Sequence, residues 1–383
     1  MDLKFWRGRN VLLTGHTGFK GGTLSLWLAS LGAKVTGVGL APSTDPSLFD
    51  LGRIGNAVHS VLGDVRDGQL LRNIVQDVRP EVVFHLAAQP LVRRSYREPV
   101  ETYATNVMGT VNLLEAVRHV GSVRACVVVT SDKCYENKER PRGHQEGDAL
   151  GGADPYSSSK ACAELVVAAY RHSYFHPDRW NEHRVGLASA RAGNVIGGGD
   201  FAEDRLVPDL MRAFAAKRPA LIRHPHAIRP WQHVLDSLAG YLLLAERLWG
   251  DGPPFAQAWN FGPATEEAHS VQSLAAALAR AWGAGADIHI DAAASPEHET
   301  QELRLDSSRA RRLLRWRPCW PLDRTIVEVV RWYQLWATGQ PVVNFAREQI
   351  AEFQHDLAVG GSVIAQRGYA ADAGRETGDG RRE

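Results

Sequence analysis

The chain has 383 residues, of which 44% are apolar, enough for roughly two domains with a substantial core. Its formal net charge of +1 argues against nucleic acid or a membrane surface as the main partner. No apolar run approaches the ~20 residues that span a bilayer, and no secretory signal is expected at the N-terminus. The four cysteines lack Cys-x-x-Cys spacing and indicate reduced thiols in a cytoplasmic protein, with no metal site expected.

A strand, a glycine-rich turn and a helix follow one another near the N-terminus. Val11–Thr14 is predicted as a buried strand, Gly15-His-Thr-Gly18-Phe-Lys-Gly21 as the turn and Gly22–Leu31 as the helix. In a dinucleotide-binding fold, Gly15 permits the tight turn and Gly18 lets a pyrophosphate approach the helix N-terminus. The alternative is an ordinary turn between strand and helix. The order of strand, turn and helix favours the interpretation that this turn binds a cofactor.

The second strand, Lys34–Leu40, should be followed by an Asp or Glu that holds the adenosine ribose, ~20 residues beyond the glycine turn. No acid stands there, and the nearest is Asp45. NAD is expected, but this departure weakens the argument for NAD over NADP. After a third strand, Val58–Leu62, Asp64 is a candidate partner for the adenine amino group. Its alternative role is the N-cap of a helix over Gly68–Val78.

The next segments continue the alternation of strands and helices. Strands are predicted at Val82–Ala87, Ala125–Thr130 and Val185–Arg191, and helices at Val100–Val120 and Tyr156–Phe175. This order predicts an α/β fold, a Rossmann-type doubly wound parallel sheet with right-handed crossovers.

Several motifs should meet at one edge of that sheet. Ligands bind beyond the carboxyl ends of the strands in such folds, and Gly15, Ala87, Thr130 and Arg191 all lie at those ends. His85 lies inside an apolar run, so we expect a core histidine rather than a catalytic one. The convergence of the motifs is stronger evidence than any one of them.

Two short segments carry the chemistry of a proton acceptor. Thr130-Ser131-Asp132-Lys133 ends a strand, and Tyr156-Ser-Ser-Ser-Lys160 begins a helix. A Tyr and a Lys four residues apart share one helix face. The ammonium favours the phenolate and lowers the Tyr pKa from ~10, which suits a base near neutral pH. Lys occurs at only seven positions, and two of them are in these segments.

The alternation breaks down from about residue 192. We expect residues 1–191 to form an NAD-binding Rossmann domain and 192–350 a smaller C-terminal α/β substrate lobe, from which the chain can cross back to the first domain. Residues 351–383 are predicted to be a polar, disordered tail. Within the lobe, helices are expected near Asp209–Ala216 and at Leu235–Trp249, Ser270–Trp282 and Leu322–Trp336, with a strand at Ala258–Phe261.

The lobe also contains a candidate clamp for a diphosphate and a sugar, made of Arg205, Arg223, Arg229 and His233. Guanidinium forks match phosphate oxygens. The alternative is that these are surface residues of an arginine-rich protein.

The combination resembles the extended short-chain dehydrogenase/reductase family and, within it, the sugar-nucleotide 4,6-dehydratases. Gly15-x-x-Gly18-x-x-Gly21 and Tyr156-x-x-x-Lys160 match the two family hallmarks, and the resemblance covers all but the C-terminal tail. Asp132-Lys133 is more specific, because the dTDP-glucose and GDP-mannose relatives carry Asp-Glu there. The other matching segments begin at Ala87, Thr130, Arg191 and Ile228. The resemblance implies CDP-glucose as the substrate and a homodimer or homotetramer as the assembly.

The resemblance also implies an internal redox cycle. Tyr156 removes the proton of the sugar C4 hydroxyl while C4 passes hydride to NAD⁺, Ser131 holds the C4 oxygen, and Lys160 holds the cofactor ribose. Asp132, kept protonated, donates to the departing C6 hydroxyl, and hydride returns to C6. Lys133 takes the place of Glu in related dehydratases and, as a neutral amine, removes the C5 proton. The alternative is that Lys133 pairs with Asp132 and another group or water is the base.

The expected site residues fall into three groups. The catalytic ones are Ser131, Asp132, Lys133, Tyr156 and Lys160. Those for the cofactor are Gly15, Thr17, Gly18, Phe19, Lys20, Gly21, Asp64, Val65, Leu86, Ala87, Ala88, Gln89, Asn106, Thr130, Tyr156 and Lys160. Those for the substrate are Gln89, Asn194, Arg205, Arg223, Arg229 and His233.

Alternative functions are another nucleotide-sugar dehydratase, a 4-epimerase and a non-catalytic, cofactor-sensing binding protein. An epimerase needs no acid and base for C6, so Asp132-Lys133 argues against it. A binding protein would be expected to lose Tyr156 or Lys160, and both are present.

Overall fold

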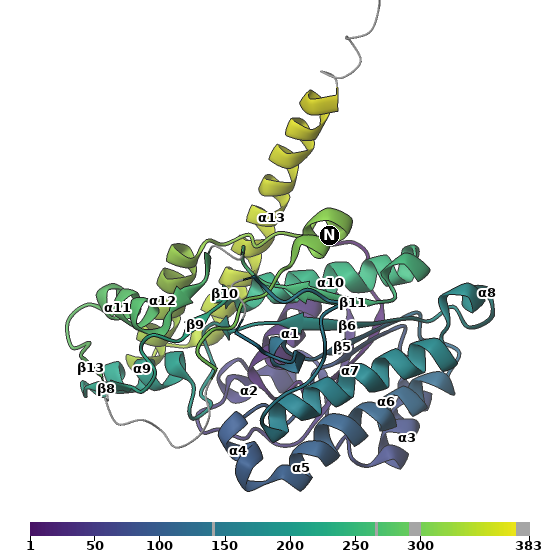
Figure 1. The fold of residues 1–383 in the computed structure, drawn as a ribbon, viewed down its shortest axis with the longest axis horizontal. Helices are drawn as coiled ribbons and strands as arrows, with labels where there is room; N and C mark the ends of the chain where they lie inside the picture. Colours follow the sequence, from purple (N-terminus) through teal and green to yellow (C-terminus); the bar gives the residue numbers. More distant parts are fainter. Residues whose placement is uncertain (140–141, 265–266, 291–299, 373–383) are drawn as a thin grey trace, which may run out of the picture.

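The computed structural model describes residues 1–139, 142–264, 267–290 and 300–372, and a seven-stranded parallel sheet forms its centre (Figure 1). The strand order is β11-β6-β5-β4-β1-β2-β3, and every neighbouring pair is parallel. The predicted doubly wound α/β fold is therefore confirmed. The strands are β1 (Asn10–Thr14), β2 (Lys34–Gly39), β3 (His59–Leu62), β4 (Val82–His85), β5 (Ala125–Val129), β6 (Gly186–Ala192) and β11 (Ala258–Phe261).

Helices cover both faces of the sheet (Figure 1). One layer contains α3 (Gly68–Val78), α6 (Gly109–Arg118) and α7 (Pro155–Ser173), and the other contains α1 (Phe19–Ser30) and α10 (Val234–Gly250). Each layer encloses its own apolar core, because successive side chains of a strand point to opposite faces. The remaining short helices of the first half are α2 (Leu48–Leu51), α4 (Val92–Arg97), α5 (Pro99–Tyr103) and α8 (Trp180–His183).

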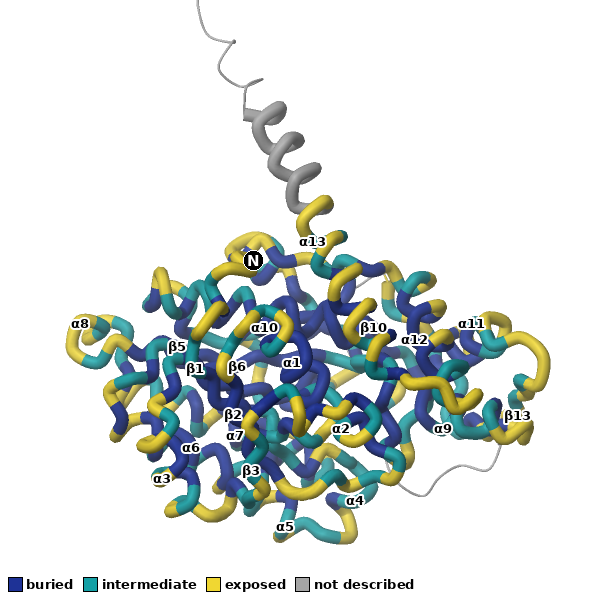
Figure 2. Tube along the Cα trace, turned by 180° about the vertical axis from the view of Figure 1, so that it is seen from behind, coloured by how far each residue is buried: buried dark blue, intermediate teal, exposed yellow. Residues whose placement is uncertain are grey.

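The strands show why both faces need cover. Leu12 and Val128 pack with the α3, α6 and α7 layer, whereas Leu13 and Val127 pack with α1 and α10. All four are buried, and Figure 2 shows the buried part of the chain concentrated in the central strands and α1. Near-continuous apolar runs are typical of parallel strands covered on both faces.

The helix predicted over Val100–Val120 is present as one continuous helical segment over Pro99–Arg118, but a π-helical turn that was not predicted divides it. The structure has α5, then a π-helical turn at Ala104–Met108, then α6. The buried Asn106 side chain lies in this turn, accepts from Gln89 N at 2.8 Å and donates to Ser159 Oγ at 2.8 Å. Single π-turns inside helices often occur at functional sites. Here the turn brings an amide toward the sheet edge.

The second half builds a smaller lobe around three two-stranded pairs. These are β7 (Val195–Ile196) with β10 (Gln232–His233), β8 (Ala220–Ile222) with β13 (Ile288–Ile290), and β9 (Ile228–Arg229) with β12 (His269–Ser270). The lobe helices α9 (Leu206–Ala215), α11 (Val271–Trp282) and α12 (Leu322–Ala337) contact one another. β11 leaves this part of the chain and joins the main sheet beside β6.

The C-terminal segment differs from the predicted tail in its first part. Helix α13 runs over Val342–Asp372, so residues 351–372 are helical, while 373–383 lie outside the described residues. Ile350 and Phe353 are buried in the core next to α1 and α12, and Asp356 pairs with Arg324 at 2.9 Å. These contacts hold the first turns of α13 to the body. No helix in the described part of the chain is long and apolar enough to cross a membrane.

Candidate active site

A cavity of about 900 Å³ lies at the carboxyl ends of β1, β4, β5 and β6, between the sheet and the lobe. Its size and place are those of a ligand site in a doubly wound fold. All the residues predicted for the site line this cavity except Asn106 and His233.

The glycine turn is built for close approach of a ligand. Gly15 has φ of +80°, and a Cβ there would lie 2.7 Å from the Ala87 nitrogen. A Cβ at Gly21 would lie 2.0 Å from the Gly15 oxygen. The turn therefore packs backbone against backbone and leaves the N-terminus of α1 open to the cavity, where N–H groups attract an anion. This cradle fits the pyrophosphate of a dinucleotide cofactor.

The adenosine end of the site lacks the usual acid. Thr17 Oγ1 donates to the Leu40 carbonyl at 2.8 Å, and Asp45 is not among the residues that line the cavity. Asp64 does line it, and Arg66 donates to it at 2.8 Å, which lowers the pKa of that carboxyl. The alternative role of Asp64 as a helix cap is wrong. Asp67 caps α3 instead, accepting from two backbone N–H groups at 3.0 Å.

Gln89 and Asn106 form a support behind the cavity wall. Gln89 is buried, lines the cavity, and donates to Thr102 Oγ1 at 2.8 Å. Asn106 touches Gln89 from the π-turn and does not line the cavity. The prediction that Asn106 contacts the cofactor is therefore corrected: it positions Gln89 and, through Ser159, the start of α7. A polar residue in an amphipathic helix was the only sequence signal.

The turn that follows β5 contains Asp132 and Lys133, the predicted acid and base. Ser131 caps the 3₁₀ turn Asp132–Cys134, donating to Asp132 Oδ1 at 3.1 Å and accepting from Lys133 N at 3.2 Å. Asp132 is 3% exposed, and burial raises the pKa of its carboxyl against the opposing charge of Lys133. Its Oδ2 has no hydrogen-bond partner among the described residues. A buried carboxyl with a raised pKa and an oxygen without a partner among the described residues is better suited to donate a proton than an exposed one.

Tyr156 and Lys160 face the same cavity from the first turns of α7, which Asp154 caps by accepting from Ser157 N at 2.9 Å. Burial raises the pKa of Tyr156 to about 12, and the Ser131 hydroxyl and the Arg205 charge oppose that rise most. Burial lowers the pKa of Lys160 to about 8, and its Nζ donates to the Val129 carbonyl at 3.4 Å. The prediction that Lys160 lowers the Tyr156 pKa is therefore wrong: burial gives a net rise, and Ser131 and Arg205, not Lys160, offset part of it.

Sequence reasoning missed a buried ion pair under this site. Glu164 and Arg191 are 3% exposed, and Arg191 Nη2 donates to Glu164 Oε2 at 2.6 Å. Thr130 Oγ1 and Ser189 Oγ also donate to the Glu164 carboxylate. The pair therefore joins the ends of β5 and β6 to α7. Glu164 lies four residues after Lys160 on the same helix face, which was the available signal.

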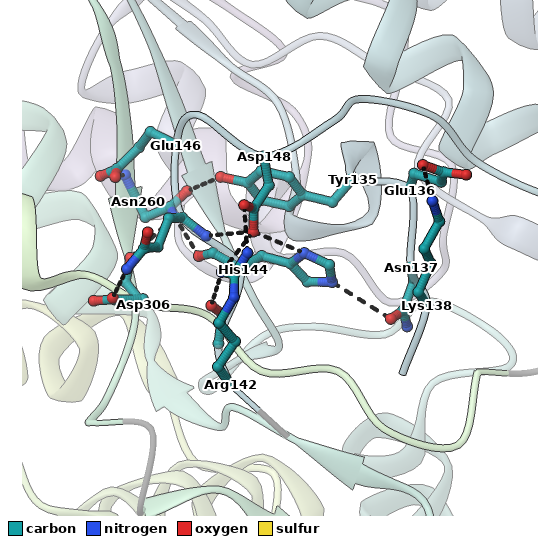
Figure 3. Close-up of polar contacts among 12 residues, drawn as sticks. Tyr135, Glu136, Asn137, Lys138, Arg142, His144, Glu146, Asp148, Asn260 and Asp306 are labelled. Atoms are coloured by element: carbon teal, nitrogen blue, oxygen red, sulfur yellow. Dashed lines mark hydrogen bonds and ion pairs between the residues drawn. The ribbon is translucent and has the colours of Figure 1, made fainter. Parts of the chain in front are cut away.

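A second network fixes the loop after the 3₁₀ turn Asp132–Cys134 (Figure 3). Tyr135 OH donates to Asn260 Oδ1 at 2.7 Å, and the Asn260 amide donates to the His144 carbonyl at 2.9 Å. The Tyr135 and His144 rings stack with centroids 4.8 Å apart, and Arg142 pairs with Asp148 at 2.7 Å. Because Asn260 belongs to β11, the loop is held by the edge strand of the sheet.

The predicted clamp is only partly assembled. Arg205 and Arg223 line the cavity, but each is paired with an acid of the same wall, Asp200 at 2.8 Å and Asp204 at 3.0 Å. Arg229 lines the cavity and donates to the Thr300 carbonyl at 2.6 Å. Arg205 precedes α9, Arg223 follows β8 and Arg229 ends β9, so their side chains depend on tertiary contacts that the sequence pattern does not reveal.

His233 does not belong to the clamp. It is 1% exposed, caps α10 by accepting from Leu235 N at 3.3 Å, and packs against Trp320 with ring centroids 4.8 Å apart. Burial lowers its pKa to about 3, so it is neutral and cannot attract an anion. His85 is a core histidine as predicted, held between Thr14 at 2.7 Å and Thr110 at 3.2 Å.

Comparison with known proteins places this geometry among nucleotide-sugar enzymes. A family model described as GDP-mannose 4,6 dehydratase matches residues 12–329. The chain is 49% identical to the CDP-glucose 4,6-dehydratase of Salmonella typhimurium over 92% of this chain and 98% of that protein. It is 27% identical to a dTDP-glucose 4,6-dehydratase of Xanthomonas campestris over 88% of this chain and 98% of that protein.

Solved structures share the fold at lower identity. The UDP-glucose 4-epimerase of Thermotoga maritima gives a TM-score of 0.73 at 22% identity, covering 85% of this chain and 98% of that one. The dTDP-glucose 4,6-dehydratase of Bacillus anthracis, solved in complex with NAD, gives 0.71 at 21% identity and covers 85% and 97%.

Proposed function

The chain belongs to the GDP-mannose 4,6-dehydratase family of extended short-chain dehydrogenases/reductases, and we propose that it works as a CDP-glucose 4,6-dehydratase. The reaction oxidises C4 of the glucose, removes water across C5 and C6, and returns hydride to C6, giving CDP-4-dehydro-6-deoxy-glucose for deoxysugar biosynthesis. One observation carries the proposal. In a chain 49% identical to such an enzyme, Asp132-Lys133 shares a cavity with Tyr156 and Lys160.

The first half of the reaction needs a base for the C4 hydroxyl. A bound NAD would supply the redox chemistry, as the acceptor of hydride from C4 and its donor to C6. Tyr156 would take the hydroxyl proton, and Ser131 would hold the same oxygen. The charge of Arg205 already opposes the burial that raises the Tyr156 pKa, and the positive nicotinamide ring would favour the phenolate further.

The elimination needs an acid for the C6 hydroxyl and a base for the C5 proton. Asp132 suits the acid, because burial raises its pKa and leaves Oδ2 free of partners among the described residues. Lys133 lines the same cavity from the adjacent position and is proposed as the base. This assignment follows the position of Glu in related dehydratases. Pairing of Lys133 with Asp132 is the competing reading.

Incubation with four donors tests the function. Purified protein with NAD and CDP-glucose should produce a sugar 6-methyl signal in the proton NMR spectrum. UDP-glucose, dTDP-glucose and GDP-mannose should react far more slowly, and Tyr156→Phe should abolish the signal. Absence of a methyl signal with every donor would refute the dehydratase assignment. A signal with another nucleotide alone would correct the substrate.

We also propose NAD rather than NADP as the cofactor. Neither an acid for the ribose hydroxyls nor a basic residue for a 2′-phosphate lines the cavity among Gly39, Leu40, Ala41, Ser43 and Thr44 at the end of β2. A 2′-phosphate would therefore enter without a cationic partner. Titration with both oxidised cofactors should show tighter binding of NAD⁺, and equal or tighter binding of NADP⁺ would contradict the proposal.

A homodimer or homotetramer in the cytoplasm is proposed as the working form. Large apolar side chains are exposed on α5–α7 and the π-turn, with Val100 81%, Met108 51% and Leu165 58% exposed. Such a patch on the outer helices favours association between copies. Val100→Glu should shift the protein to monomer in analytical ultracentrifugation, and an unchanged mass would contradict the proposed interface. All four cysteines are free, as in a reducing compartment.

A further inference from the structure

Lys20 occupies a position that helix electrostatics disfavour. It is the second residue of α1, two positions after the Gly18 N-cap, and the first turn contains no acidic residue. The N-terminus of a helix carries a partial positive charge, so a cation there is unfavourable. Lys20 is also one of only seven lysines in an arginine-rich chain. A lysine at such a place calls for a compensating role.

The surroundings of Lys20 point to the catalytic end of the cavity. Its half-buried side chain lines the cavity and interacts electrostatically with Asp132, Lys160, Asp200 and Arg205. Among the described residues, no carboxylate lies within ion-pair distance and no side chain hydrogen-bonds its amine. Asp132 and Lys160 are the groups at which the sugar and the nicotinamide must meet. Lys20 is therefore close enough to these groups to act on the charge of a ring bound beside them.

We propose that Lys20 sets the redox balance of the bound nicotinamide, because its ammonium disfavours the positively charged oxidised ring relative to the neutral reduced ring. Hydride transfer from C4 adds one proton and two electrons to the ring, which changes the positively charged nicotinamide into a neutral dihydronicotinamide. A nearby cation therefore favours hydride uptake by the ring. Once the ring is reduced and neutral, the cation no longer weakens cofactor binding by charge repulsion. The proposal rests on the proposed function only in requiring a nicotinamide cofactor.

Two other roles for the same amine make different predictions. An amine that clamps the pyrophosphate would strengthen NAD⁺ and NADH equally, since both carry the same phosphates. An amine that clamps the diphosphate of the substrate would strengthen nucleotide-sugar binding and leave both cofactor forms unaffected. Only an amine near the ring distinguishes the two redox forms. The ratio of the two dissociation constants is therefore the decisive quantity.

The test measures binding of NAD⁺, NADH and CDP by calorimetry at pH 7, without substrate. Lys20→Met, which keeps the length and removes the charge, should lower the ratio Kd(NAD⁺)/Kd(NADH) by roughly tenfold. Lys20→Arg should keep the wild-type ratio. Lys34→Met should leave the ratio unchanged and serves as the matched control, because this exposed lysine begins β2 at the strand end opposite the cavity.

A pH series provides an independent readout. Burial and the Arg205 charge lower the pKa of Lys20 to about 8, so the wild-type ratio should fall as pH rises through that value. The four charged groups facing Lys20 are Asp132, Lys160, Asp200 and Arg205, and Lys160 also has a pKa of about 8. Lys20→Met should retain only the Lys160 part of the change. Lys20→Arg should keep its charge and a higher ratio above pH 9.

Several outcomes would overturn the proposal. Equal weakening of NAD⁺ and NADH in Lys20→Met would assign the amine to the pyrophosphate, and weakening of CDP alone would assign it to the substrate. An unchanged ratio in a variant that melts like the wild type would remove Lys20 from the redox balance. Failure of the wild-type protein to bind either cofactor would instead refute the proposed function.

Discussion

Burial acts on Asp132 and Lys160 in opposite directions and brings both toward their neutral forms near pH 7. It raises the pKa of the carboxyl and lowers that of the amine to about 8. Burial therefore weakens the charge of these two groups, whereas Arg205 in the same cavity keeps its charge through the pair with Asp200. The nicotinamide ring and the sugar diphosphate would therefore meet a cavity whose charges respond to them.

The role of Lys133 is open to a direct test. Lys133→Met should lower the rate at which the C5 hydrogen exchanges with deuterated solvent by about a hundredfold or more, because the variant lacks the proposed base. NMR of the sugar measures the exchange, and calorimetry should show unchanged NAD binding. Lys138→Met, at an exposed lysine paired with Glu136, is the matched control. Retained exchange in Lys133→Met would remove Lys133 from the mechanism.

Gly15 gives a prediction about the cofactor cradle. Gly15→Ala would place a methyl group 2.7 Å from Ala87 N in a backbone conformation that disfavours side chains. We expect NAD affinity to fall at least tenfold, measured by calorimetry. Gly121→Ala, where the added methyl meets nothing within 4 Å, is the control and should bind normally. Normal NAD binding by Gly15→Ala would contradict the prediction, since it would show that the turn accommodates the added methyl group.

Among the elements, α7, β5 and β6 are joined by one ion pair rather than by apolar packing alone. Glu164→Gln would leave Arg191 buried without its counter-charge, and breaking a buried pair typically destabilises by about 3–5 kcal/mol. Urea unfolding measures the loss. Glu182→Gln breaks the exposed pair with Arg179 and should change stability little. Equal effects of the two variants would mean that the buried pair has no special role.

Asp236 on α10 links that helix to the segment before α12, and its burial makes stability depend on pH. Burial raises its pKa to about 7, above the unfolded value of 3.8. Its contribution is therefore complete below pH 3.8 and is lost as pH rises through 7. Asp236→Asn keeps an oxygen for the Cys319 N–H and should stabilise the fold at pH 8 by up to about 4 kcal/mol. The gain in urea unfolding should shrink toward pH 4, and a pH-independent difference would contradict this origin.

The sequence was informative where a local pattern decides the structure. Apolar runs predicted β1 to β6, and the glycine spacing predicted the turn before α1, because strand burial and a positive φ leave clear residue signatures. The π-turn at Asn106 and the capping role of His233 depend on partners far along the chain. The Glu164–Arg191 pair likewise exists only once α7 and β6 are packed together. No local pattern distinguishes such residues from surface polar ones.

At the scale of the whole molecule, the sheet and the lobe are not successive units. β11 comes from residues 258–261, after the lobe has begun, and pairs with β6 through Ala258–Ser189 to Phe261–Ala192. All seven residues of β6 are buried. A chain ending at residue 191 would therefore expose the edge of β6 and lack α10, which covers the sheet. We expect it to be insoluble or to lack a cooperative thermal transition by circular dichroism, and a folded, monomeric product would contradict this.

Because β11 follows the first lobe elements in the sequence, recombination between related genes cannot easily exchange the lobe alone. A crossover near residue 191 looks natural from the motif order, since it separates the glycine turn and the Tyr-Lys helix from the arginine-bearing lobe. It would, however, pair a β6 from one parent with a β11 from the other and replace Asn260, which holds Tyr135 behind the catalytic turn. Substrate preference in this lineage is therefore expected to change by substitutions on the lobe strands, within an inherited chain, rather than by exchange of the lobe.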